Sequence, residues 1–373
     1  MATATTTIAP VTQSQPASKT VTEQRYVALD AYRGFIMFVL ASEGFGFEHL
    51  THHPTYGRIA AWFDHVPWEG AVFWDLIMPA FMFMVGVAMP FSLARRRQEG
   101  ASKRQEFWHV VARVLKLLLL SQILIIASSQ KVQLKTVNTL FTIAFAYFFT
   151  FLILKLTFRW QVVTAVLILS LHWALFALFP GPEGAFSRTG NIGMVIDKAL
   201  LGHNYPEYGN PVTINFITGT VTMLFGAWTG MLLRSDRTRA QKLKILGIAT
   251  VAAFAGGLAL SPVNPIIKLL WTASFTLYST GWVLLMMLAF IIVIEVWGYR
   301  KFAFPLVVVG MNSIFIYSCT FLLKPAIDGW LMGFTGGFKF VGELAPVAQS
   351  CAAMLVLWYL CYWLYQHKIF IKA

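Results

Sequence analysis

The segment GAVFWDLIMPAFMFMVGVAMPFSL, residues 70–93, and the segment ARRRQEGASKR that follows it, residues 94–104, indicate the class of this protein. The first is an apolar run with one charge, at Asp75, and it is long enough to cross a bilayer, which takes about 20 mostly apolar residues in a helix. The second concentrates arginine and lysine, as cytoplasmic loops do. We therefore expect a membrane-spanning helix whose C-terminal end faces the cytoplasm.

The rest of the chain has the same character. Of its 373 residues 57% are hydrophobic and 12% charged, against about a quarter charged in a soluble domain. The length criterion predicts about ten spans, at residues 28–46, 70–93, 107–128, 137–156, 160–180, 213–233, 243–261, 275–297, 302–323 and 346–367. We expect an all-α membrane protein, a polytopic helical bundle of about ten transmembrane helices. Small residues in GVA (86–88) and FGAWTG (225–230) predict closely packed helices.

Positive charge sets the expected orientation. Lysine and arginine gather in the connections 94–104, 154–159, 234–244 and 299–301 and at the C-terminal end. If the N-terminus is cytoplasmic, all of these face the cytoplasm, and the C-terminus does too. The net charge of +13 then reflects loops that face anionic membrane lipids, not nucleic-acid binding. We expect a multi-pass protein of the cell (inner) membrane.

The two ends of the chain differ in composition. Residues 1–24 are mostly Thr, Ala, Ser, Gln and Pro and have neither the basic nor the apolar region of a signal peptide. They predict a disordered cytoplasmic tail. Residues 25–373 are expected to form a single transmembrane domain.

Polar groups within the spans are functional candidates, because each is costly in the membrane. Glu43 has no cationic neighbour at helical spacing, so it faces a wet cavity or lies at the interface. Asp75 needs a partner from another helix or a polar cavity. Asn312 and Ser313 fall in the middle of a span and need hydrogen-bond partners, from another helix or from a ligand.

His65 lies in WFDHVPWEGAVFWD, residues 62–75, at the expected outer face. Trp68 suits the membrane interface, and Gly70 permits close approach of backbones. On these residues alone, His65 is either functional or an ordinary loop histidine. We expect no metal site, because the cysteines lie in apolar stretches without paired spacing. Motifs for ATP, dinucleotides and α/β-hydrolase chemistry are absent from the sequence.

Several motifs occur together in order. The first is R-x-x-x-L-D-x-x-R-G, at Arg25, Leu29, Asp30, Arg33 and Gly34. The second is H-x-x-W-x-G-x-x-x-x-D followed by P-x-F-x-F-x-x-G, at His65, Trp68, Gly70, Asp75, Pro79, Phe81, Phe83 and Gly86. GTVTMLFGAWTGMLLRS (219–235), NPIIKLLWTASFTLYSTG (264–281) and GMNSIFIYS (310–318) follow. Over residues 25–370 the chain resembles the heparan-alpha-glucosaminide N-acetyltransferase family and its bacterial relatives.

The resemblance implies a transmembrane acyltransferase that takes acetyl-CoA from the cytoplasmic side and acetylates an amino sugar on the other side. The catalytic histidine of the family matches His65 here. We expect Asp75 to orient its imidazole, Glu43 and Trp68 to contact the acceptor, and the donor to be bound by Lys135, Asn312 and Ser313.

The chain departs from the family pattern in two places. Phe141 and Thr142 stand where relatives have a Gln-Arg pair, although Lys135 is retained, and Glu43 stands where they have an asparagine.

Two routes of transfer remain open from the sequence. His65 either deprotonates the acceptor amine or carries the acetyl group as a transient acyl-imidazole. The expected partners are acetyl-CoA, an amino sugar or glycan and membrane lipids, with a homodimer left open. A sugar or lipid-linked-intermediate transporter or flippase is the alternative function, since it would use the same polar groups. A degenerate member that acts only as a membrane scaffold is a third hypothesis.

Overall fold

The computed structural model describes residues 26–132, 135–206 and 209–371. The predicted tail, residues 1–24, and Arg25 of the first motif lie outside the described residues. Helices account for the secondary structure in these ranges, which contain no strand. The helices are α1 (Val27–Ala41), η1 (Gly44–Leu50), α2 (Gly57–Ala60), η2 (Phe73–Leu76), α3 (Ile77–Gln98), α4 (Lys103–Ser129), α5 (Thr139–Ile153), α6 (Phe158–Leu178), α7 (Ile192–Leu201), α8 (Asn215–Arg234), α9 (Arg239–Leu260), α10 (Ala273–Ile291), η4 (Ile292–Val296), α11 (Arg300–Met311), α12 (Ser313–Leu322), α13 (Lys324–Thr335), η5 (Gly336–Leu344) and α14 (Ala345–Gln366).

Each predicted span contains a helix, but not every helix is long enough to cross a membrane. In the described residues, 7 helices are long and apolar enough to cross a membrane. The number is 8 if α11 and α12, which are bent by 67° relative to each other, form one span. Helices α1 and α5 have 15 residues each, or about 22 Å at 1.5 Å per residue, against a hydrocarbon core of about 30 Å. The structure confirms an all-helical, multi-span architecture, and the number ten stays a prediction.

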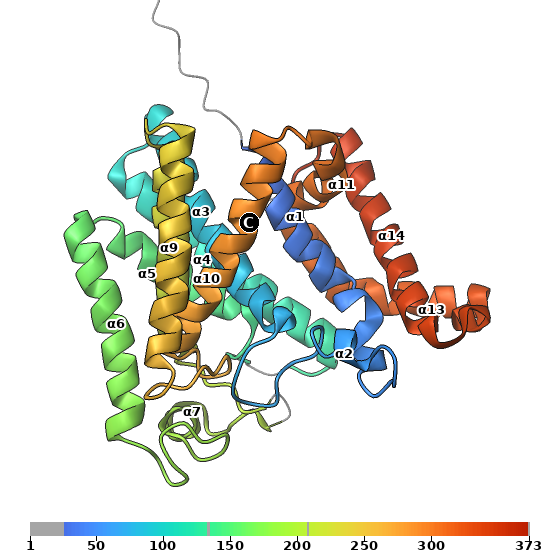
Figure 1. The fold of residues 1–373 in the computed structure, drawn as a ribbon, viewed down its shortest axis with the longest axis horizontal. Helices are drawn as coiled ribbons and strands as arrows, with labels where there is room; N and C mark the ends of the chain where they lie inside the picture. The colour runs from blue at the N-terminus through green and yellow to red at the C-terminus, as the bar shows by residue number, and fades with distance from the viewer. Residues whose placement is uncertain (1–25, 133–134, 207–208, 372–373) are drawn as a thin grey trace, which may run out of the picture.

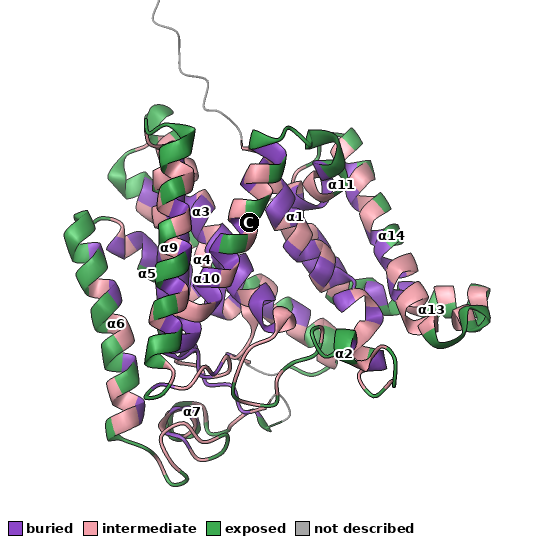
Figure 2. Cartoon of the chain, viewed as in Figure 1, coloured by how far each residue is buried: buried purple, intermediate pink, exposed green. Residues whose placement is uncertain are grey.

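The exposed surface of the bundle is apolar where lipid is expected. Helices α6 and α9 lie along one side of the bundle, and α14 lies on the other, with α1 and α10 between them (Figure 1). Figure 2 shows α6 and α9 largely exposed and α1 largely buried. The exposed side chains of α6 and α9 include large apolar ones, such as Leu171, which is 66% exposed, and Val251, which is 68% exposed. Such faces suit contact with acyl chains.

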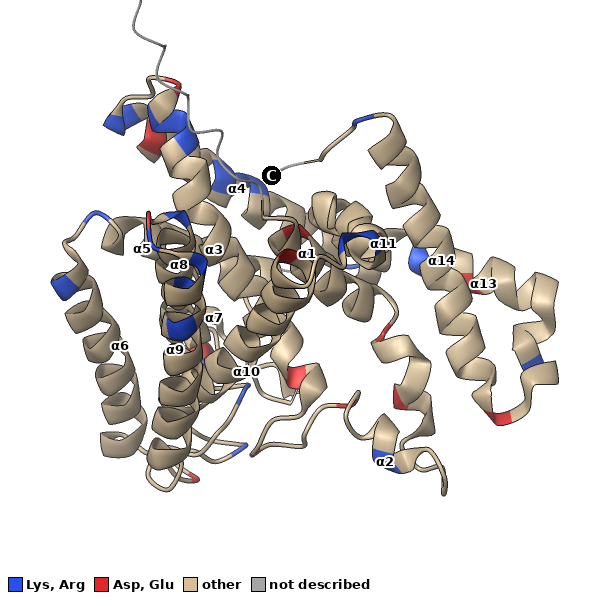
Figure 3. Cartoon of the chain, turned by 45° about the horizontal axis from the view of Figure 1, so that its top comes forward, with Lys and Arg blue, Asp and Glu red and all other residues tan. Residues whose placement is uncertain are grey.

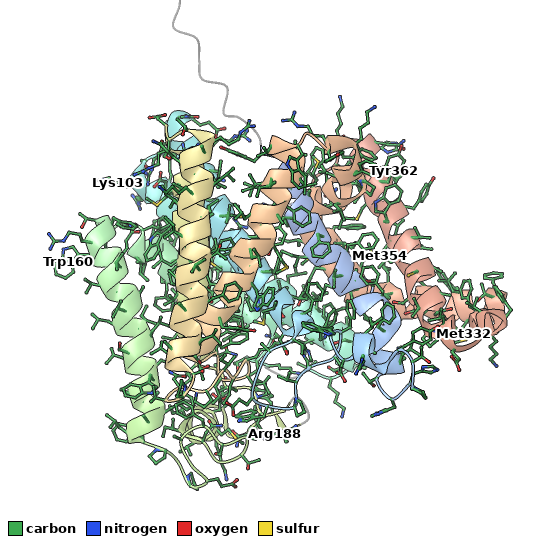
Figure 4. All side chains as sticks on the ribbon, viewed as in Figure 1. Lys103, Trp160, Arg188, Met332, Met354 and Tyr362 are labelled. Atoms are coloured by element: carbon green, nitrogen blue, oxygen red, sulfur yellow. The ribbon has the colours of Figure 1, made fainter. Side chains whose placement is uncertain are left out.

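The basic connections lie together at one end of the bundle, which we call the basic end. Contacts near the ends of the helices join them: Lys242 Nζ lies 3.4 Å from the Tyr26 hydroxyl, and Arg234 donates to the Pro90 carbonyl at 3.2 Å. Lysine and arginine gather along the upper part of Figure 3, and Lys103 and Trp160 mark the same end in Figure 4. The shared end agrees with the charge pattern of the sequence.

Close packing of two helix pairs depends on glycine. In α3 and α8, a methyl group at Gly86 would lie 2.0 Å from the Met223 carbonyl oxygen, and one at Gly226 would lie 2.1 Å from the Phe83 carbonyl oxygen. Helices α1 and α11 meet in the same way at Gly34. Such backbone contact is typical of membrane helices, and it confirms the prediction made from GVA and FGAWTG.

Candidate functional site

The site is built by two connections at the opposite end, which we call the loop end. Residues 61–72 connect α2 to η2, and residues 261–272 connect α9 to α10. Gly70 has φ +105°, which favours glycine, and its N–H donates to the Ile266 carbonyl at 2.8 Å. This bond holds the two connections side by side.

Trp68 anchors the first connection to a third one. Its indole Nε1 donates to the Phe186 carbonyl at 2.8 Å, and its ring packs against a cluster that includes Ile267 and Leu270. The structure therefore gives Trp68 a positioning contact beside the site. Its expected contact with the acceptor stays a prediction.

Asp75 is buried at the first turn of the span, with 1% of its side chain exposed. Its Oδ2 accepts from the Val72 N–H at 3.2 Å and from the Val66 N–H at 3.4 Å. Its Oδ1 lies 2.7 Å from His65 Nδ1. A carboxylate is also favoured here by the positive end of the helix dipole. His65 is therefore one of the partners that the apolar span requires.

Lys268 is the other partner, and the sequence did not reveal it. Its Nζ lies 3.2 Å from Asp75 Oδ1 and 3.1 Å from His65 Nδ1. The residue stands in NPIIKLLW, where a cation in an apolar stretch was the available signal. Burial lowers the pKa of the Lys268 ammonium below its ordinary value, while the Asp75 carboxylate acts in the opposite direction.

The two contacts at His65 Nδ1 favour different tautomers of the ring. A carboxylate only accepts, so the 2.7 Å contact with Asp75 is a hydrogen bond when Nδ1 carries the hydrogen, whereas the Lys268 ammonium donates to Nδ1 when it does not. In the first of these tautomers the lone pair of the neutral ring is on Nε2. The His65 side chain is 53% exposed, so Nε2 is placed to take a proton from, or to attack, a bound molecule.

His65 faces a small cavity of about 150 Å³. Lys268 lines it with apolar and aromatic side chains, among them Trp74, Phe81 and Tyr317. A few polar groups in an apolar cavity are typical of small-molecule sites.

A second cavity, of about 430 Å³, opens toward the basic end. Its polar lining residues are Arg33, Ser92, Arg95, Arg96, His109, Arg113 and Ser313. Phe81 lines both cavities. Its ring stacks on Tyr317 with centroids 6.3 Å apart and an angle of 13°. Phe81 is therefore a wall residue that the arginine-lined cavity and the His65 cavity share, and Tyr317 lines the His65 cavity beside it.

The three expected donor residues are not brought together. Ser313 lines the arginine-lined cavity, where it begins α12 after the bend. Asn312 is buried, and its side-chain amide bonds the backbone near the C-terminus, donating to Ile369 O at 3.1 Å and accepting from Ile371 N–H at 2.9 Å. Lys135 lies at the loop end, in the connection that leads into α5. For all three residues, donor binding stays a prediction.

Glu43 lies in a third cavity, of about 520 Å³. Its Oε2 accepts from Lys324 Nζ at 2.7 Å. The cation is supplied by a helix far along the chain, which is why no neighbour at helical spacing was found. In the described part of the chain, no group of three or more His, Cys, Asp or Glu side chains is placed to hold a metal ion.

Comparisons with known proteins give one relationship. No family model matches the chain. The chain is similar to heparan-alpha-glucosaminide N-acetyltransferase of Mus musculus, with 23% identity over an alignment of 372 residues. The match covers 81% of this chain and 54% of the relative, so the chain spans about half the length of the curated relative that it matches. This distant similarity supports the resemblance drawn from the sequence motifs.

Proposed function

We propose that this protein is a transmembrane N-acetyltransferase that moves an acetyl group from acetyl-CoA at the basic end to the amine of an amino sugar at the loop end. The observation that carries the proposal is the contact of His65 with Asp75 and Lys268 beside a cavity that shares the wall residue Phe81 with the arginine-lined one. The activity named for the mouse relative supports the choice of acyl group.

The charge pattern orients the proposed enzyme. Basic connections face the cytoplasm in membrane proteins, so the basic end and both termini are cytoplasmic and His65 faces the other side. About ten crossings are possible only if α1 and α5, which are short, span the membrane together with the loops that flank them. The proposed location of the protein is the cell (inner) membrane.

His65 acts on the acceptor in this mechanism. Its Nε2 removes a proton as the amine attacks the thioester carbon, so that an N–C bond forms and the C–S bond breaks. The proton then passes to the departing thiolate. Asp75 holds the Nδ1–H and so keeps the ring in the reactive tautomer. Alternatively, Nε2 attacks the thioester carbon first, so that the C–S bond breaks and CoA leaves as the thiolate. The amine then attacks the acetyl-imidazole, the bond from Nε2 to the acetyl carbon breaks, and the proton of the amine passes to the thiolate.

The arginine-lined cavity suits the phosphates of the donor. Arginine binds phosphate through paired hydrogen bonds, and Ser313 adds the N-terminus of a helix of 10 residues. Arg96 makes no ion pair with the residues that the structure describes. To reach His65, the acyl arm would have to pass Phe81, which lines both cavities.

The proposal is tested with purified protein in liposomes that contain acetyl-CoA on one side and glucosamine on the other. Release of free thiol together with N-acetylglucosamine, detected by mass spectrometry, is the expected result. Uptake of sugar without consumption of acetyl-CoA would contradict it and would favour a transporter or flippase. If neither reaction occurs and acetyl-CoA does not change the thermal stability, the protein is a scaffold.

Lys268 gives a prediction for the pH dependence. The Lys268 ammonium stabilises the charge of the Asp75 carboxylate. Activity is therefore present below the pKa of Lys268 and is lost as pH rises through it. Because burial lowers this pKa from 10.5, the loss occurs below pH 10.5. Lys268→Met is expected to reduce kcat/KM by about 10- to 100-fold, as for a lost charged hydrogen bond, and to remove this alkaline limb.

The measurement is kcat/KM from pH 7 to 11, corrected for folded protein. Lys268→Arg should retain activity and remain active at higher pH, because guanidinium keeps its proton. Lys244→Met, an exposed change at the basic end, is the control. An unchanged alkaline limb in Lys268→Met would show that another group titrates.

Arg96 gives a prediction for the donor. Arg96→Gln is expected to raise the KM for acetyl-CoA about tenfold through loss of one phosphate contact. The KM for S-acetylpantetheine, which lacks the nucleotide phosphates, should not change. Arg159, exposed in the first turn of α6, provides the control Arg159→Gln. An equal rise for both donors would argue against a phosphate site here.

A further inference from the structure

A fourth cavity, of about 210 Å³, lies at the basic end, and we call it the interface cavity. Its lining residues are Tyr26, Leu233, Arg237, Arg239, Lys242, Leu243, Leu246, Ile291 and Glu295. It shares no described lining residue with the arginine-lined cavity or with the His65 cavity. We propose that the interface cavity binds the headgroup phosphate of an anionic phospholipid. This inference does not depend on the proposed acetyl transfer.

Three cations line the interface cavity, and none of them is in an ion pair with a residue that the structure describes. Lys242 Nζ donates to neutral oxygens, the nearer of which is the Leu233 carbonyl at 2.6 Å. Arg239 Nη1 donates to the backbone carbonyl of Glu295 at 2.9 Å. Arg237 is exposed and has no hydrogen bond or ion pair within the described ranges.

Among the described lining residues Glu295 is the one acid, and its carboxylate already has partners. Its Oε2 accepts from Arg300 Nη2 at 3.0 Å, and its Oε1 accepts from the Ala28 N–H at 3.1 Å. Asp236, in the connection before α9, is exposed and does not line the cavity. The positive charges in the cavity are therefore not balanced by the acid beside them. They repel each other, and an anion that enters relieves this repulsion.

The donors that remain in the cavity suit phosphate. A guanidinium carries several N–H donors, and the contact with Glu295 uses one nitrogen of Arg239. Arginine binds phosphate through paired hydrogen bonds. Helix α9 begins at Arg239 after the capping residue Thr238, so the positive end of its dipole adds to the field.

The position of the cavity favours a lipid over a soluble phosphate. Helix α9 is long and apolar enough to span a membrane, and Arg239 is its first residue. Figure 3 shows lysine and arginine at the upper ends of α8 and α9. The rest of the lining is largely apolar and includes Leu243 and Leu246, a turn or more inside the span. Farther along α9, Val251 belongs to the exposed apolar face.

A phospholipid matches this arrangement, with its phosphate at the level of Arg239 and its acyl chains beside the apolar face of α9. In the proposed orientation this level is the cytoplasmic leaflet, where anionic lipids attract basic segments. The bound phosphate would join Arg237 of the connection to Arg239 and Lys242 of α9, next to Glu295, which holds the start of α1. The lipid is therefore expected to stabilise the packing of these helices.

The test measures lipid binding to the purified protein in detergent by native mass spectrometry. The probes are dioleoyl-phosphatidylglycerol and dioleoyl-phosphatidylcholine. The wild type should prefer phosphatidylglycerol, because the cations of the cavity repel the choline group. Arg237→Gln should reduce the affinity for phosphatidylglycerol about tenfold, through loss of one charged hydrogen bond, and should leave phosphatidylcholine binding unchanged. Phosphatidylglycerol should also raise the melting temperature of the wild type more than that of the variant.

Lys244→Gln is the matched control, because it removes the same charge from an exposed residue of α9 that does not line the cavity. It should bind both lipids as the wild type does. The ratio of the two affinities within one variant does not depend on the fraction that folds. Equal losses in Arg237→Gln and Lys244→Gln, or no preference in the wild type, would show only general attraction to the basic end and would overturn the site.

Two soluble competitors distinguish a lipid from other sources of phosphate. Glycerol 3-phosphate and acetyl-CoA are each added in excess to the lipid-bound protein at constant ionic strength. Neither should displace phosphatidylglycerol. Displacement by glycerol 3-phosphate would assign the cavity to soluble phosphates, and displacement by acetyl-CoA would assign it to the acyl donor. Either result would overturn the lipid assignment.

Discussion

Replacing His65 with alanine is expected to reduce acetyl transfer by about 10³-fold, within the usual range for loss of a general base. The ring is the group that contacts Asp75 and lines the small cavity. Its removal leaves the arginine-lined cavity intact, so the affinity for acetyl-CoA should not change. The measurement is the initial rate of N-acetylglucosamine formation at saturating donor.

His52→Ala is the control, because His52 is exposed in the connection before α2. An undiminished rate in His65→Ala would remove His65 from the mechanism. The same preparation distinguishes the two routes. Wild-type protein incubated with labelled acetyl-CoA and no acceptor should acquire label on His65 only if the ring carries the acetyl group.

Replacing Gly226 with valine is expected to prevent folding or to cost at least about 3 kcal/mol, the upper end of typical overpacking. The first added carbon would lie 2.1 Å from the Phe83 carbonyl oxygen, which belongs to the backbone of α3 and cannot rotate away. Helices α3 and α8 would have to separate. The measurement is the yield of monodisperse protein in detergent and its melting temperature.

Gly247→Val is the matched control, since a carbon added at Gly247 in α9 meets no heavy atom within 4 Å in the described residues. Its melting temperature should equal or exceed that of the wild type, because valine is a better helix former than glycine. A normal melting temperature for Gly226→Val would show that α3 and α8 are not in backbone contact.

Sequence alone predicted the helical class, the positions of the helices and the gathering of basic connections at one end. These features depend on the local content of apolar and charged residues. It also singled out His65 and Asp75, which are 10 residues apart and belong to one connection and the turn after it. Their contact could be anticipated because the chain between them is short.

The tertiary structure alone revealed the partners that come from distant parts of the chain. Lys268 is 193 residues from Asp75, and Lys324 is 281 residues from Glu43. Asn312 was expected to need a partner, and its partner is the backbone near the C-terminus. The composition of a local segment does not predict these pairs. Their positions follow from which helices pack together, and packing depends on the summed fit of many side chains and close glycine contacts across the whole bundle.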